Sequence, residues 1–492
     1  MADLKIVDFA VILRNIVDLG KPQEACFDEE SAKSVLQDVL TSNSEWFMVA
    51  SDVAQRVCSL AKHDIIRLEL PDIEVLDVGS NTKRLYYCSE EDIIQKLASG
   101  QLSKVNIALT IHRSGVLLVN FHMRFQNSDG MPIDQAIENA RINLRPLVMK
   151  LPVNQLFRPE VVSDEDKIKE DRGRFIVSND ANLFIGSLKD LVSEVIRPNL
   201  IKRLSSKFGL QPLRDHRCIS STLLQIYAMN PACDRIDTFV MPAQFGREIH
   251  GLGSLDRAYK NRSENMVTSA LGNDLADDEE AGVFTFGLSD LIMFDSSLDK
   301  IVETTVQQKK YKDRYAAVLY NTTHYSCLLE WVYLEKYILD LYNRMLSRTI
   351  ARKNTSPEEM LVIQKQTMHD LIGYKAGITP FPSREDFWEK ARVAHRIPEA
   401  QEKFEKKRDL ATDYVIQEYT LRTNKSIQLI NIFISATAAF SLMQVIVNIW
   451  QPGLPGHKSW WVLGTMVLFA ATSLFLWCMN RFFLTWSRNL KR

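Results

Sequence analysis

The sequence predicts an α+β fold class, with mixed α/β domains in the cytosol, a long α-helical stalk after them, and two transmembrane helices at the C-terminal end. Three observations lead to this prediction. Residues 105–125 alternate between apolar and polar side chains, as a β-hairpin does. Beyond residue 311 the apolar side chains recur at helical spacing. Residues 426–457 and 459–480 contain no Asp, Glu, Lys or Arg, which is typical of membrane spans.

Composition limits the class of protein. The 492 residues are enough for two or three domains, and the net charge of -1 gives no indication of direct nucleic-acid binding. Seven cysteines stand singly, without a CxxC pair or a Cys/His cluster at zinc-ligand spacing, so we expect reduced, cytosolic thiols. The N-terminal segment carries Asp3, Asp8 and Arg14 among its apolar residues and does not fit a secretory signal.

The predicted hairpin has one apolar and one polar face. A three-residue loop, 113–115, keeps both faces consistent because it pairs His112 with Val116. This loop places Gly115 in the left-handed conformation that the turn requires. The polar face holds His112 and His122, which we expect to be surface residues. The sheet would therefore be covered by other elements on one side only.

The strand and helix periodicities of apolar residues predict further elements along the chain. Strands are expected at 65–78 and 83–88 and helices at 90–99 and 132–151, which gives a cytosolic α/β domain over residues 1–155. A charged stretch, 163–174, is expected to make a surface connection. The second mixed α/β cytosolic region, 156–310, has predicted strands at 174–178, 221–229, 238–241 and 283–294 and a predicted helix at 187–207.

The rest of the chain is predicted to be helical. Residues 311–397 form a helical hairpin whose second helix starts with Ser356 as N-cap, Pro357 at the first helical position and Glu359 completing a capping box. No Gly or Pro interrupts residues 399–450, so one stalk helix, 398–450, should continue into the first transmembrane helix. The outside loop 451–458, the second transmembrane helix 459–480 and the basic cytosolic tail 481–492 follow.

Basic residues flank the two spans on the same side, and tryptophans lie near the span ends. The positive-inside rule then places both termini in the cytoplasm, in a multi-pass protein of the inner (plasma) membrane. The alternative is a pair of buried core helices. A soluble core helix, however, rarely runs past about 18 uncharged residues.

Residues 325–492 hold a hairpin helix (CLLEWVYLEKYILDLYNRM), a stalk-to-membrane junction (LRTNKSIQLINIFISA), a Pro/Gly turn, a second span and a basic tail. This order resembles the CorA superfamily of divalent-cation transporters, which implies a CorA-like funnel: a homopentamer whose first spans line a central pore. The family's Gly-Met-Asn motif is missing, since residues 447–453 read VNIWQPG, and this argues against magnesium transport. CorA-like membrane effectors of prokaryotic antiviral defence, opened by a nucleotide messenger, are compatible with its loss.

Polar residues of the first span recur every three or four positions, close to the 3.5 period of a left-handed helix bundle. They could line a water-filled pore. Alternatively, they could form interhelical hydrogen bonds in a packed bundle, at about 0.6 to 2 kcal/mol per pair. Neither span contains an acidic residue, so ion selectivity should be weak. The predicted pore-lining residues are Asn424, Gln428, Asn431, Ser435, Ala438, Ser441, Leu442, Val445 and Asn448.

Two cytosolic segments could bind an effector, either a nucleotide-type ligand or a divalent cation. Residues 244–262 combine glycines with cations and could cradle phosphates, although they lack a Walker pattern and could equally be an ordinary loop. The acidic run 274–280 could hold a divalent cation or be a solvated loop. The candidate ligand-binding residues are Arg247, His250, Gly251, Gly253, Arg257 and Lys260. The candidate metal ligands are Asp274, Asp277, Asp278, Glu279 and Glu280.

Taken together, these features predict a homo-oligomeric, CorA-like channel or effector that is gated by a ligand on its cytosolic domain. No catalytic triad, HExxH helix or nucleotide-hydrolysis motif is present, so an enzyme is not expected. The alternatives are a divalent metal cation (Mg, Co, Zn or Ni) transporter and a non-conducting membrane-anchored signalling or scaffold protein. The expected partners are the membrane, further copies of the chain, and a small-molecule or ion ligand.

Overall fold

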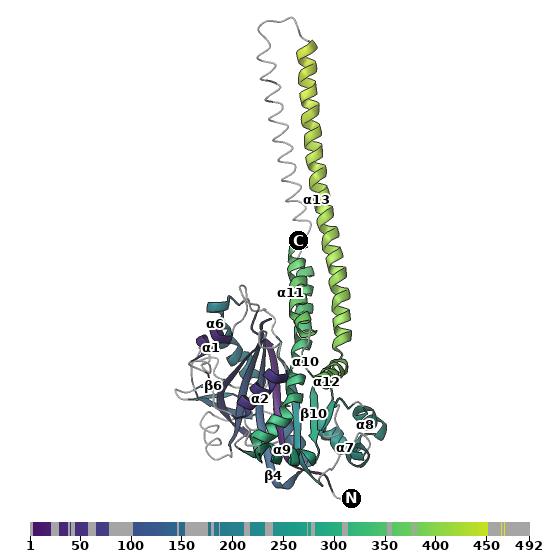
Figure 1. The fold of residues 1–492 in the computed structure, drawn as a ribbon. Coiled ribbons are helices and arrows are strands. Elements are labelled where there is room, and N and C mark those ends of the chain that lie inside the picture. The colour runs from purple at the N-terminus through teal and green to yellow at the C-terminus, as the bar shows by residue number, and fades with distance from the viewer. Residues whose placement is uncertain are drawn as a thin grey trace. The chain divides into compact units, whose positions relative to one another are not determined.

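The structure, a computed structural model, describes residues 3–20, 29–37, 40, 45–57, 65–77, 102–144, 147–152, 176–178, 182–185, 187–210, 217–231, 240–272, 274–276, 281–307, 313–351, 357–375, 379, 381–450, 464 and 467 (Figure 1). The chain divides into two compact units. One unit consists of Met1–Leu346 with Ile363–Lys406, and the other of Ser347–Val362 with Lys407–Arg492.

A ten-stranded sheet is the centre of the first unit (Figure 1). Its strand order is β6-β7-β5-β2-β3-β4-β1-β8-β10-β9, and neighbouring strands are antiparallel except for the parallel pair β8 and β10. The strands are β1 (Lys5–Asp18), β2 (Ile65–Asp77), β3 (Leu102–His112), β4 (Val116–Pro132), β5 (Leu147–Pro152), β6 (Ile176–Ser178), β7 (Asn182–Ile185), β8 (Ile219–Asn230), β9 (Ala281–Thr285) and β10 (Ser289–Phe294).

Helices cover both faces of this sheet. The main hydrophobic core lies on the face that carries Phe9, Val11 and Leu13 of β1, where residues of α1, α4, α5, η5, α6 and α7 pack against the strands. These helices are α1 (Glu29–Leu36), α4 (Ile133–Ala140) with η3 (Arg141–Leu144), α5 (Leu188–Asp190), the π-helical η5 (Leu191–Ile196), α6 (Arg197–Phe208) and α7 (Val240–Ser254). Two short helices, η6 (Tyr259–Asn261) and α8 (Glu264–Leu271), follow α7.

The opposite face carries many polar side chains and is nevertheless buried. It packs against α2 (Glu45–Val57) and the 38-residue α10 (Arg314–Ala351): Trp46 of α2 stacks on His122, and Arg14 of β1 donates to the Ser326 carbonyl of α10. His112 and His122 have exposed fractions of 0% and 2%. The prediction of a half-covered sheet with surface histidines is therefore wrong, because α2 and α10 cover the polar face and α10, about 200 residues later in the chain, supplies hydrogen-bonding partners for it.

The predicted hairpin is confirmed in its turn and register. β3 ends at His112 and β4 begins at Val116, so the loop consists of residues 113–115. The strands pair Ile111 with Leu117, as the parity of the sequence requires. Gly115 has a φ of 81° and donates its amide to the His112 carbonyl.

Other predicted elements are confirmed or corrected. The strands predicted at 65–78 and 221–229 and the helix at 187–207 are present as β2, β8 and α5 to α6. The helix predicted over 132–151 ends after η3, and residues 147–152 form strand β5 instead. Val240 and Met241, predicted in a strand, begin α7. The elements predicted at 83–88 and 90–99 lie outside the described residues. Strands from both sides of residue 155 belong to one sheet, so that boundary does not separate two sheets.

The C-terminal region is helical, as predicted. After α9 (Ser297–Gln307) and α10 come α11 (Pro357–Lys375), α12 (Pro382–Ala394) and α13 (Ile397–Trp450). The last of these is one uninterrupted helix of 54 residues, about 81 Å long at 1.5 Å per residue. The stretch Ile397–Leu442 is long and apolar enough to cross a membrane, and its most apolar window is entirely unburied. The second predicted span, 459–480, lies outside the described residues except for two positions.

Candidate functional site

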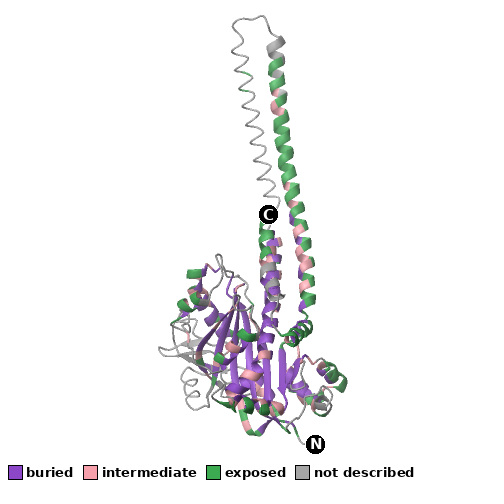
Figure 2. Cartoon of the chain, in the orientation of Figure 1, coloured by how far each residue is buried: buried purple, intermediate pink, exposed green. Residues whose placement is uncertain are grey.

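Helix α13 continues without a break because no Gly or Pro occurs between Pro398 and Pro452 and because charged pairs one turn apart support the part of the helix before residue 424. Lys406 bonds Glu402 at 2.6 Å, and Arg422 pairs with Glu418. From residue 416 to residue 445, no side chain that the structure describes is buried (Figure 2). This long exposed helix is the first candidate functional element.

The predicted pore-lining residues from Asn424 to Val445 are all exposed in the structure, whereas the side chain of Asn448 lies outside the described part. Within the described chain, the amides of Gln428 and Asn431 form no hydrogen bond. Ser441 donates to the Thr437 carbonyl of its own helix at 3.0 Å. We call the positions 410, 414, 417, 421, 424, 428, 431, 435, 438, 442 and 445 the seam of α13, since they alternate steps of three and four along one face.

The part of the seam before residue 424 was not identified from the sequence. Leu410, Tyr414 and Leu421 precede the apolar stretch of α13 in the same register, and their exposed fractions are 71%, 56% and 62%. The seam is thus polar after residue 424, where the rest of α13 is apolar. It is apolar before residue 424, where the rest of α13 is charged. The seven-residue spacing of Tyr414, Leu421 and Gln428 would have revealed this continuity if the heptad pattern had been extended before residue 424.

Buried ion pairs hold the start of α13 in the first unit. Arg392 of α12 donates twice to Glu335 of α10, at 2.9 Å for each bond, with side chains 6% and 1% exposed. His395, two residues before α13, lies 3.4 Å from a carboxylate oxygen of Asp290 in β10. The other carboxylate oxygen of Asp290 lies 3.5 Å from Arg14. The sheet, α10 and α12 are therefore joined through charged groups at the root of the long helix.

A second buried polar cluster joins α10 to the other half of the sheet. Glu330 of α10 accepts from Arg67 of β2 at 2.5 Å and from Asn120 of β4 at 2.9 Å. Sequence reasoning missed this cluster. The available signal was that Glu330 interrupts an otherwise apolar stretch of α10 while polar residues alternate with apolar ones over residues 120–126 of β4.

The glycine-rich segment 244–262 is mostly helical: it consists of α7, kinked at Phe245, and the short η6. Its glycines allow close packing. A Cβ atom on Gly251 would lie 2.6 Å from Tyr259 Cγ, and one on Gly253 would lie 1.9 Å from Phe286 Cε2. His250 is buried, and burial is the main reason that its pKa is lowered.

The predicted cations of this segment face carboxylates. Lys260 lies 3.0 Å from Asp134, which also raises the pKa of Lys260 through their hydrogen bond. Arg257 pairs with Glu138. Arg247 lies 3.9 Å from Glu264 and bonds the Lys260 carbonyl. The structure thus places these side chains in ion pairs that attach α7 and η6 to α4 and α8.

Of the five predicted metal ligands, only Asp274 is described. One of its carboxylate oxygens accepts from the backbone amides of Ala276 and Val283, at 3.0 and 2.8 Å, and so fixes the chain before β9. No group of three or more His, Cys, Asp or Glu side chains that could hold a metal ion is found among the described residues. Residues Asp277, Asp278, Glu279 and Glu280 lie outside them.

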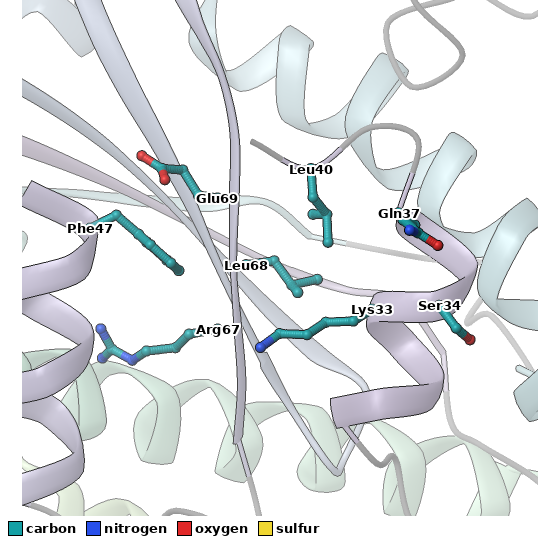
Figure 3. A pocket seen from close by; sticks show the side chains of 8 residues that line it. All are labelled: Lys33, Ser34, Gln37, Leu40, Phe47, Arg67, Leu68 and Glu69. Atoms are coloured by element: carbon teal, nitrogen blue, oxygen red, sulfur yellow. The ribbon is translucent and has the colours of Figure 1, made fainter. Parts of the chain in front are cut away.

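A cavity of about 510 Å³ lies at the edge of the sheet, between α1, α2 and β2 (Figure 3). Arg67 and Glu69 leave β2 on the side of α2, whereas Lys33 extends toward β2 from α1. Phe47 and Leu68 add apolar surface. The lining residues are Lys33, Ser34, Gln37, Leu40, Phe47, Arg67, Leu68 and Glu69.

Comparison with known proteins gives no relative for this chain, since no family model, no curated protein and no solved structure matches it.

Proposed function

We propose that the protein is a membrane channel or effector in which several copies of α13 turn their seams toward a common axis, with a ligand on the N-terminal α/β domain controlling the pore. The observation that supports this proposal best is the seam itself. Its apolar residues, such as Leu410 and Leu421, are exposed before the apolar segment, and its amides, such as Asn431, are exposed within that segment and bond no other described residue.

Both parts of the seam are unfavourable on an isolated helix. An unpaired amide in hydrocarbon costs roughly 2 to 7 kcal/mol, depending on the reference environment. A large apolar side chain left in water forgoes about 1.5 to 3 kcal/mol of burial energy. Association along one face reduces both costs, because Leu410, Tyr414 and Leu421 would become buried and Gln428 and Asn431 would meet water or one another.

A pore explains the number of polar residues better than packing alone does. Interhelical hydrogen bonding needs only a few side chains per helix, whereas Asn424, Gln428, Asn431 and Ser435 extend the polar face over three turns of α13. Neutral amides and hydroxyls would pass hydrated ions with weak selectivity. Leu442 and Val445, further along the seam, would form an apolar constriction.

Ligand control is proposed from the contacts of α10. This helix is bonded to the sheet through Glu330, and through Glu335 to Arg392 of α12, the helix that precedes α13. A ligand that shifts α10 relative to the sheet would therefore change the position of α12 and of the start of α13. The proposed location is the inner (plasma) membrane, with the α/β domain in the cytoplasm.

The proposal is tested by conductance together with native mass spectrometry of the full chain. In planar bilayers, Asn431→Leu should reduce single-channel conductance several-fold, because it replaces a hydrophilic seam residue. Thr437→Leu makes a comparable polar-to-apolar change away from the seam and should leave conductance unchanged. The mass of the detergent-extracted protein should correspond to at least three copies, with five expected. A dimer, or equal conductance of both variants and the parent protein, would rule out a pore lined by the seam.

A further inference from the structure

The cavity beside β2 lies at an open stretch of the sheet. β5 pairs only with Glu74–Asp77 of β2, so residues 65–70 have no strand on that side within the described part of the chain. Helix α1 lies on the side of the hydrophobic core, and α2 lies on the side of the polar face. A volume of about 510 Å³ is within the range of small-molecule sites, which is roughly 300 to 1,000 Å³.

The lining combines three kinds of group with one carboxylate, Glu69. Lys33 and Arg67 are cations, Ser34 and Gln37 can form hydrogen bonds, and Phe47 with Leu40 and Leu68 offers apolar contact, including one aromatic face. Cations with an aromatic ring suit an anionic group attached to a flat apolar body. We propose that this cavity binds a small organic anion in which a phosphate or carboxylate is attached to such a body.

Arg67 connects this site to α10. Its guanidinium bonds a Glu330 oxygen at 2.5 Å, and the other Glu330 oxygen accepts from Asn120 at 2.9 Å. The Arg67 and Glu330 side chains are 15% and 6% exposed, so their attraction is little screened by solvent. An anion in the cavity competes with Glu330 for the guanidinium. Binding then weakens one of the contacts that hold α10 against the sheet.

Glu69 opposes the anion. Its carboxylate is in the lining and the residue is 4% exposed, so it lowers the affinity of the empty cavity for a negative group. The lining holds two cations, Lys33 and Arg67, and one anion, Glu69, and Arg67 is also bonded to Glu330, so a bound anion has to displace that carboxylate. Neutralising Glu69 or Glu330 should therefore strengthen anion binding, and neutralising Lys33 should weaken it.

Anion binding to the cavity does not depend on the proposed function, whereas the effect of binding on α13 rests on it. Binding is measured on the full chain in lipid nanodiscs by titration with saturation-transfer difference NMR, with empty nanodiscs as background. Phenyl phosphate and phenylacetate serve as anionic probes, and benzyl alcohol serves as the neutral probe. At least one anion should bind more tightly than benzyl alcohol, and the tighter anion identifies the preferred group.

Two variants test the geometry. Lys33→Gln should weaken binding about tenfold, whereas Lys300→Gln, the same change on the exposed face of α9, should have no effect. Glu330→Gln should strengthen binding several-fold, because the Glu330 carboxylate no longer competes with the bound anion for Arg67. Equal affinity for all three probes, or an unchanged affinity in Lys33→Gln, would overturn the site. An unchanged or weaker affinity in Glu330→Gln would overturn the competition. Neither outcome alters the number of copies or the conductance, so a failure here is distinct from a failure of the proposed channel.

Discussion

Single residues of the polar sheet face show how burial changes their chemistry. His122 stacks on Trp46 with ring centroids 4.6 Å apart, and its Nε2 lies 3.2 Å from the Tyr315 hydroxyl. Burial, with a smaller contribution from Arg124, lowers the pKa of His122 to about 3. The imidazole is therefore neutral in the folded protein at every pH above that value.

This pKa predicts a pH dependence of stability. Between pH 6.5 and about 3 the unfolded chain protonates His122 and the folded chain does not, so acid favours unfolding. Each pH unit below 6.5 should lower the free energy of unfolding by about 1.4 kcal/mol from this residue. Urea titrations at pH 7.0, 6.0 and 5.0 would measure it. In His122→Gln the slope should be smaller by that amount, and an identical slope in both proteins would contradict the assignment.

The close packing around the glycines of α7 leads to a second prediction, about the stability of a glycine-to-alanine variant. A glycine-to-alanine change inside a helix normally stabilises it by up to about 1 kcal/mol. At Gly253 the sign should reverse, to a loss of about 1 to 3 kcal/mol, because the new methyl group would overlap Phe286. Adding Phe286→Leu should recover part of the loss, as measured by thermal unfolding. A stabilised Gly253→Ala protein would contradict the packing role.

For single residues of the hairpin, the sequence could not predict whether a polar side chain is exposed or buried. The alternation of residues 105–125 correctly separated the two faces of the hairpin. It could not show that α10, two hundred residues later, would supply Glu330 to Asn120 and Tyr315 to His122. The glycine-rich segment was similarly ambiguous, since glycine serves both phosphate loops and close helix packing.

At the scale of elements, local periodicity predicted most helices and strands, and tertiary pairing decided the exceptions. Residues 147–152 read as the end of a helix, but they pair with both β2 and β7 and so become a strand. α13 was predicted almost to the residue, because helix breakers stand at both of its ends and none lies between them.

The part of the seam before residue 424 leads to a prediction about assembly. Leu410→Ser combined with Leu421→Ser should shift the extracted protein toward smaller oligomers, because two apolar contacts per copy are lost. Ile416→Ser with Tyr419→Ser removes a similar apolar area from exposed positions off the seam, at 48% and 50% exposure, and should have a smaller effect. Light scattering coupled to gel filtration would compare the masses of the parent protein and the two double variants. A larger effect of the off-seam pair would place the interface on another face.

At the scale of the whole molecule, the proposed account joins a ligand cavity, a polar network and a pore. Arg67 contacts the cavity and α10, Glu335 joins α10 to α12, and α13 begins directly after the buried His395. The sequence indicated the membrane segment and the long helix. It did not indicate the cavity, whose lining comes from α1 and the residues just after it, from α2 and from β2, with no shared motif.

The central claim is that the seam of α13 faces water in the assembled membrane protein. The most direct test introduces single cysteines at Asn431, Ser435, Ile434 and Thr437 in a chain whose seven native cysteines are replaced by alanine. A charged, membrane-impermeant thiol reagent is then applied to the open channel in planar bilayers. The account predicts rapid modification and loss of current at 431 and 435, with no change at 434 and 437. Equal protection of all four positions, or modification at 434 and 437 alone, would contradict it.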